Sequence, residues 1–127
     1  MIYFAALALL VILDGTWLAI MVNRFYRPNM HHLLGETINF IPAVIFYLIY
    51  AFAITYFIVW QSNDKTLWNV FLNGALLGLT VYAGYNLTNQ ATLKDWPSIL
   101  SIVDISWGTL MTGLVSLGTV WISRKFF

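Results

Sequence analysis

Residues 10–21 read LVILDGTWLAIM, which places the acidic residue Asp14 in the middle of an otherwise apolar segment. The apolar segment extends in both directions to cover residues 2–22. A helix needs about 20 mostly apolar residues to cross a bilayer, so the length of this segment predicts a membrane-spanning helix. The position of Asp14 raises the question of which partners an acid has inside a membrane.

Composition places the whole chain in the membrane class. Of its 127 residues, 61% are hydrophobic and 9% are charged, and the mean hydropathy is +0.79. Soluble domains average about 25% charged residues, so this chain has too little charge to cover a water-exposed surface. A net charge of +1 provides no basic field for nucleic acid. The absence of cysteine excludes disulfides, thiolate metal sites and thiol redox chemistry.

Three further apolar segments have a similar length, and we expect spanning helices over 2–22, 38–60, 68–90 and 98–122. The segments lack the period-two alternation of membrane β-strands, which are about half as long. We therefore predict an all-α polytopic membrane protein, a small antiparallel bundle of four helices in one transmembrane domain, 1–127. An even number of spans places both termini on the same side of the bilayer. The Lys and Arg counts of the two sides are tied and leave the orientation open.

A second aspartate repeats the pattern of the first. The first span contains VILDGTW and the fourth contains SIVDISW, so each carries D-x-x-W: Asp14 with Trp17, and Asp104 with Trp107. Residues three apart share a helix face, and side chains lean toward the helix N-terminus. We therefore expect each indole N–H to donate to the carboxyl group of its own helix.

Both aspartates lie toward the same side of the membrane. We call face B the side of the loops 23–37 and 91–97, and face A the side of the termini. Asp14 lies about 3 Å past the centre of its span and Asp104 about 9 Å short of the centre of its own, both toward face B, at 1.5 Å per residue. The third span ends in GYNLTNQ, which brings a tyrosine and two asparagines into the same half. The predicted polar site consists of Asp14, Asp104, Tyr85, Asn86, Asn89, Trp17 and Trp107.

A charged aspartate near the bilayer centre costs roughly 2.5–3.5 kcal/mol on insertion scales, so such residues usually face the bundle interior or a water-filled cavity. Two interpretations remain open. In the first, the acids form a carrier or binding site for a small solute, a cation or a proton. In the second, they are hydrogen-bonding groups within a non-catalytic accessory subunit that packs against a larger membrane enzyme or complex. An enzyme acting on lipid is a third alternative, but we predict no catalytic residues and no cofactor, because no hydrolase or nucleotide motif is present.

Two other sequence patterns have more than one interpretation. His31, His32 and Glu36 include ligand types that suit zinc, but no second ligand cluster accompanies them, and we predict a solvated loop without a metal site. Residues 74–78 read GALLG, a GxxxG motif that lets membrane helices approach closely. The sequence leaves open whether these glycines pack within one chain or in a homodimer. Four short helices enclose little space, so a transport path would need a dimer.

Several segments together resemble one family of small bacterial membrane proteins with four spans and no known activity. The segments are D-x-x-W in the first span, FYRPNMHHLLGE (25–36), NFIPAVIFYLIY (39–50), GYNLTNQATLKDWP (84–97) and VDISWG (103–108). The most specific part is Y-N-L-T-N-Q-A-T-L-K-D-W-P followed by V-D-x-x-W-G, and the resemblance covers nearly the whole chain. The family usually has aspartate where this chain has Asn86, so carboxylate chemistry at that position is unavailable here. The resemblance implies a bacterial inner-membrane protein and supplies no activity.

Overall fold

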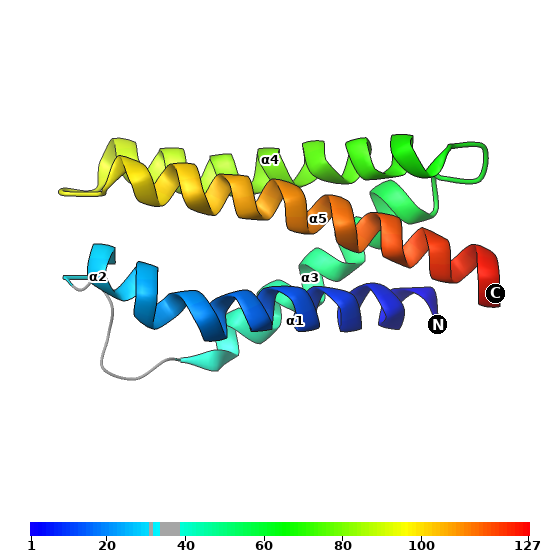
Figure 1. The fold of residues 1–127 in the computed structure, drawn as a ribbon, viewed down its shortest axis with the longest axis horizontal. Helices are drawn as coiled ribbons and strands as arrows, with labels where there is room; N and C mark the ends of the chain where they lie inside the picture. Colours follow the sequence, from blue (N-terminus) through cyan, green and yellow to red (C-terminus); the bar gives the residue numbers. More distant parts are fainter. Residues whose placement is uncertain (31, 34–38) are drawn as a thin grey trace.

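The computed structural model describes residues 1–30, 32–33 and 39–127, and all regular secondary structure in these residues is helical. Helices long and apolar enough to cross a membrane cover Ile2–Met30, Phe40–Val59, Leu67–Thr92 and Ser98–Phe126. The predicted all-α, four-span architecture is therefore confirmed. Both chain ends lie at the same end of the helical assembly (Figure 1).

The first span is longer than the sequence suggested. It consists of α1 (Ile2–Met21), the π-helical segment η1 (Val22–Tyr26) and the short helix α2 (Arg27–Met30). A loop was predicted after residue 22 because polar side chains follow, but Asn23 and Arg24 instead occupy exposed positions of a helix that continues. A π-helical turn bonds residue i to residue i+5, and the last residue of η1, Tyr26, is buried.

The other spans begin at recognisable caps. The second consists of α3 (Phe40–Ile54) and the π-helical segment η2 (Thr55–Val59), and the side chain of Asn39 accepts a hydrogen bond from the Ile41 N–H. The third, α4 (Leu67–Thr92), begins after Thr66, whose hydroxyl oxygen accepts from the Asn69 N–H. The fourth, α5 (Ser98–Phe126), begins after Pro97. The Asn39 and Thr66 side chains supply partners for N–H groups that have none within the helix, whereas Pro97 makes no such bond.

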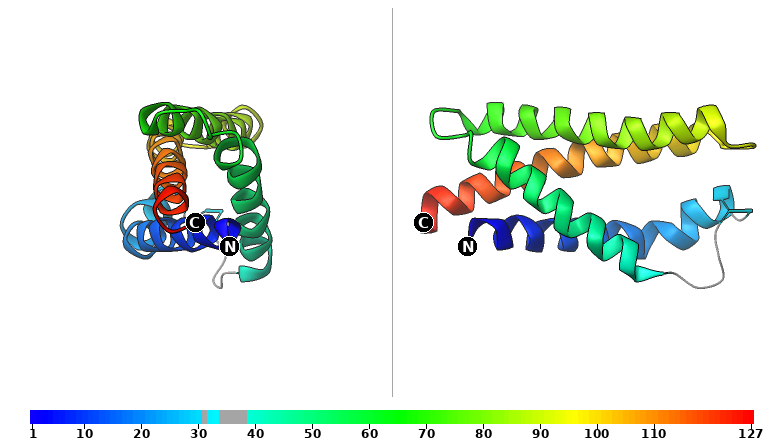
Figure 2. Two further views of the ribbon diagram at one scale, coloured as in Figure 1. Left: turned by 90° about the vertical axis from the view of Figure 1, so that its right-hand side faces the viewer. Right: turned by 180° about the vertical axis from the view of Figure 1, so that it is seen from behind.

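The four spans form the sides of a square when viewed along the long axis (Figure 2, left). Helices α4 and α5 form an antiparallel hairpin with the most extensive contact, and α1 packs against both α5 and α3. Helix α3 is tilted, so it crosses α1 and approaches α4 mainly through η2 (Figures 1 and 2). The half of α3 nearer face B therefore lies apart from α4.

The hairpin depends on small residues. A Cβ atom at Gly74 would collide with Ser116, and one at Gly78 would collide with the Gly108 carbonyl oxygen and the Thr112 side chain. The Ser116 hydroxyl donates to the Thr112 carbonyl oxygen at 2.7 Å, so this buried polar group is satisfied within its own helix. The GxxxG motif of α4 thus packs against α5 within one chain.

Two apolar clusters leave a polar layer between them. The larger one joins all four spans and consists of Leu10, Tyr50, Ala51, Ile54, Ile58, Val59, Val70, Met111, Val115 and Val120. The smaller one lies toward face B around Tyr26, Trp96 and Leu100. The two aspartates of the spans lie between these clusters.

A matched pair of glycine substitutions tests the hairpin. Gly78→Ala should lower the free energy of unfolding by about 1–3 kcal/mol, because the added methyl meets the backbone of α5. Gly84→Ala should raise it by roughly 0.5–1 kcal/mol, because a Cβ there meets nothing within 4 Å and alanine is the better helix former. Unfolding in mixed detergent micelles measures both, and equal effects of the two substitutions would contradict the close packing of α4 on α5.

Candidate functional site

Asp14 is held by groups from two other spans. Its side chain is 7% exposed. The Tyr47 hydroxyl of α3 donates to Oδ2 at 2.5 Å, and the Trp107 indole N–H of α5 donates to Oδ1 at 2.9 Å. This one carboxyl group therefore connects α1 to both α3 and α5.

Asp104 has the same kind of environment. The Tyr26 hydroxyl of η1 donates to Oδ1 at 2.6 Å, and the Asn86 amide of α4 donates to Oδ2 at 2.7 Å. The Tyr26 oxygen in turn accepts from the Trp17 indole N–H at 2.9 Å. Asp104 is partly buried, so it is more accessible than Asp14.

Each tryptophan is connected to the aspartate of the other helix, so the predicted hydrogen bond between the tryptophan and aspartate of the same helix is wrong. Trp107, three residues after Asp104, donates to Asp14, and Trp17, three residues after Asp14, reaches Asp104 through Tyr26. The two indoles stack with centroids 4.4 Å apart and planes within 4°. The physical reason is the contact between antiparallel α1 and α5, which lets the two rings face one another. Helical spacing within one chain segment contains no information about that contact.

The predicted site residues fall into two groups. Asp14, Asp104, Asn86, Trp17 and Trp107 belong to one hydrogen-bonded and stacked network. Tyr85 is 57% exposed and packs edge-on against Trp96, and Asn89 hydrogen-bonds to the Tyr85 side chain. These two residues therefore lie beside the network, at the surface of the assembly.

Two tyrosines were missing from the sequence interpretation. Tyr26 fell within the predicted loop 23–37, and Tyr47 fell within the predicted second span without being singled out. Each donates to an aspartate. Depth along the spans could have indicated these tyrosines, because both lie in the half of the bundle nearer face B, where the polar residues concentrate. Which of several aromatic residues points inward depends on helix rotation, which the sequence did not determine.

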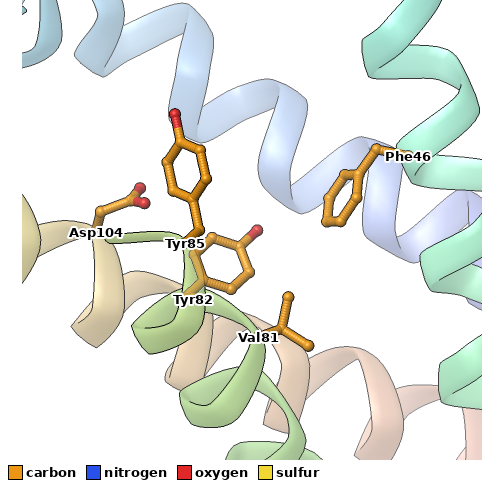
Figure 3. Close-up of a pocket in the computed structure, with 5 residues that line it drawn as sticks. All are labelled: Phe46, Val81, Tyr82, Tyr85 and Asp104. Carbon is orange, nitrogen blue, oxygen red and sulfur yellow. The ribbon is translucent and has the colours of Figure 1, made fainter. Parts of the chain in front are cut away.

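A cavity of about 270 Å³ lies beside Asp104. It is lined by Phe46, Val81, Tyr82, Tyr85 and Asp104. Figure 3 shows Phe46 of α3 facing the side chains from α4, with the Asp104 carboxyl group beside Tyr85. The cavity is partly open. Asp104 is the one carboxylic acid among its described lining residues, and the others are apolar or aromatic.

The site brings together acids without cations. The donors that the structure provides to Asp14 and Asp104 are two phenols, an indole and an amide, all of them neutral. The described residues contain no group of three or more His, Cys, Asp or Glu side chains that could hold a metal ion. His31 and Glu36 of the zinc alternative lie outside the described residues.

Each carboxyl group has one partner that can only donate a hydrogen bond and one hydroxyl partner that can either donate or accept. The Trp107 indole and the Asn86 amide nitrogen can only donate, so they require an acceptor oxygen. The hydroxyls of Tyr47 and Tyr26 can donate to a carboxylate or accept from a carboxylic acid. Either aspartate can therefore be charged or neutral without breaking its hydrogen bonds.

The chain belongs to the family described as Predicted membrane protein (DUF2177), whose model matches residues 1–121. This confirms the family expected from the sequence, and the family has no assigned function. No curated protein and no solved structure matches the chain.

The crossed arrangement predicts unequal effects of two similar substitutions. Trp107→Phe should lower the free energy of unfolding by about 1–3 kcal/mol more than Trp17→Phe, because it leaves a buried carboxyl oxygen of Asp14 without a donor. Trp17→Phe removes a donor from Tyr26, whose own bond to Asp104 stays intact. Both changes replace one ring of the same indole stack by a smaller ring, so the loss of stacking energy is similar in the two variants and cancels in the comparison. Thermal unfolding in detergent measures the difference, and a larger loss from Trp17→Phe would contradict the assignment.

Proposed function

We propose that the protein carries or binds a small solute or cation in the membrane, and that Asp14 and Asp104 take up and release protons as it does so. The observation that carries this proposal is the pairing of each acid with a reversible tyrosine hydroxyl. A carboxyl group that only fastens helices needs no such reversibility. A carboxyl group that titrates inside a membrane does, because breaking a hydrogen bond there leaves a polar group without a partner.

No cationic side chain among the described residues donates to either acid, and this supports the same conclusion. A carboxylate in an apolar environment requires compensation by a positive charge or by a proton. The described partners of both acids are neutral. A bound cation or a proton would supply the missing charge, and the two would then compete for the same carboxyl groups.

An accessory role is the alternative, and one observation favours it. Every oxygen of the two carboxyl groups already has a hydrogen-bond donor within the chain. A protein that packs against a larger membrane complex would use the same network only to fix the helices. In that case changes in protonation would have no consequence for activity.

We propose that the protein lies in a bacterial inner membrane, as the resemblance noted in the sequence implies. We propose further that both termini lie on the same side, because the candidate spans are even in number and both chain ends lie at one end of the assembly (Figure 1). Reporter fusions after Phe127 and before Met1 should report the same compartment. Opposite compartments would show that one of the four helices does not cross the bilayer.

Replacing each acid by its amide separates the carrier from the accessory role. In Asp14→Asn, the amide oxygen can accept from Trp107 and the amide nitrogen can donate to Tyr47, so folding should change by less than about 1 kcal/mol, in keeping with the average of roughly 0.6 kcal/mol for membrane hydrogen bonds. Asp104→Asn should likewise retain its bond to Asn86. Both variants should abolish proton-coupled flux in proteoliposomes, because an amide cannot titrate.

Asp64→Asn is the matched control. Asp64 is exposed in the loop between η2 and α4, away from both acids of the spans, so its amide variant should retain full flux. Infrared difference spectra of the carboxylic C=O stretch provide a readout that does not require the solute. The carrier proposal would be contradicted by wild-type flux in both Asp14→Asn and Asp104→Asn, or by the absence of a carboxyl signal from either acid on changing the pH. The accessory role would then remain.

A further inference from the structure

The cavity beside Asp104 has the size of a site for a small molecule. Its volume of about 270 Å³ lies just below the usual range of roughly 300–1,000 Å³ for ligand pockets. The cavity combines an apolar wall with few polar groups, as such pockets commonly do. Its occupant must therefore be small and largely apolar.

The chemistry of the lining favours a positively charged group. Phe46, Tyr82 and Tyr85 contribute aromatic rings, and Asp104 contributes a carboxyl group. Aromatic faces attract cations, most strongly where water is excluded. An ionised carboxylate has about four acceptor positions, and Tyr26 and Asn86 use one on each oxygen of Asp104. Asp104 can thus accept further hydrogen bonds from an occupant.

A second acceptor lies next to that carboxyl group. The Asn86 amide oxygen is buried and has no hydrogen-bond partner in the described structure, while the nitrogen of the same amide donates to Asp104. A buried acceptor without a donor costs about 1–3 kcal/mol. The Asn86 side chain is fully buried and does not line the cavity, so an occupant reaches the open acceptor positions of Asp104.

The cavity is accessible from the side of the bundle. Phe46 is 39% exposed and Tyr85 is 57% exposed, so the lining reaches the outer surface of the helices. This surface lies where α3 diverges from α4. In a membrane that surface faces lipid, so an occupant would enter from the bilayer and must be soluble in it.

We propose that the cavity binds a small hydrophobic primary amine in its ammonium form. The ammonium group donates to the open acceptor positions of Asp104, and the apolar body lies against Phe46, Val81 and Tyr82. This assignment rests on the proposed function and names its substrate class. The ligand must have N–H donors as well as a positive charge, and its apolar body must be small enough for the cavity.

Three probes of similar shape test the ligand chemistry on the wild-type protein in nanodiscs. They are 2-phenylethylamine, its N,N,N-trimethyl derivative and 3-phenylpropan-1-ol, and empty nanodiscs correct for partition into lipid. The amine should bind about tenfold more tightly than the alcohol, because charge-assisted hydrogen bonds are roughly twice as strong as neutral ones. The trimethyl derivative has charge without N–H donors and should also bind about tenfold more weakly than the amine. Equal binding of all three probes would overturn the proposal.

Variants test the location. Val81→Phe fills the cavity and should weaken amine binding about tenfold. The matched control is Val44→Phe, the same substitution at an exposed position of α3 that does not line the cavity, and it should bind the amine as the wild type does. Asp104→Asn should remove the preference for the amine over the alcohol. Unchanged amine binding in both Val81→Phe and Asp104→Asn would overturn the assignment.

The two proposals can fail separately. Proton-coupled flux with carboxyl signals from Asp14 and Asp104, but without saturable amine binding, would overturn the substrate class and leave the carrier. Amine binding that depends on Val81 and Asp104 in a protein without such carboxyl signals would support the substrate class and overturn the proton coupling.

Discussion

Lipid tails offer a carboxyl group neither hydrogen-bond donors nor counter-ions, so Asp14 and Asp104 depend on the rest of the chain for the bonds that they make in the structure. Asp14 of α1 is bonded to α3 and α5, and Asp104 of α5 is bonded to η1 and α4. The network therefore contacts every span. Apolar packing alone discriminates poorly between helix rotations in a solvent as apolar as leucine, whereas these bonds form only when all four helices have the observed rotation.

The nature of the donors allows the two acids to change their protonation state within the network. If both acids were held only by N–H groups, a protonated carboxyl group would lack a partner, because its new O–H donor would find no acceptor among them. The hydroxyls of Tyr26 and Tyr47 provide that acceptor, because each oxygen can accept when its own proton is not needed. Stability and titration are therefore compatible in the same network.

Hydropathy was sufficient to predict the four helices, and depth along the spans grouped Asp14, Asp104 and Asn86 in one half of the bundle, but the bonds between them were not predicted. The errors came from interactions between helices. The polar side chains of Asn23 and Arg24 suggested a loop, yet they lie on the exposed side of a helix that carries Tyr26 to Asp104. The i, i+3 rule assigned each indole to its own aspartate, yet the contact between α1 and α5 exchanged them. Local spacing defines a helix face, but only packing defines what that face meets.

The stacked indoles of Trp17 and Trp107 have a consequence for how the sequence can change over time. Trp107 of α5 donates to Asp14 of α1, and Trp17 of α1 is linked to Asp104 of α5 through Tyr26. Residues that share such a network show interaction energies of about 0.5–3 kcal/mol, so their substitutions are not additive. Positions 14, 17, 104 and 107 should accordingly co-vary as one unit among relatives, whereas an isolated position such as Gly84, which has open space beside it, is free to change alone.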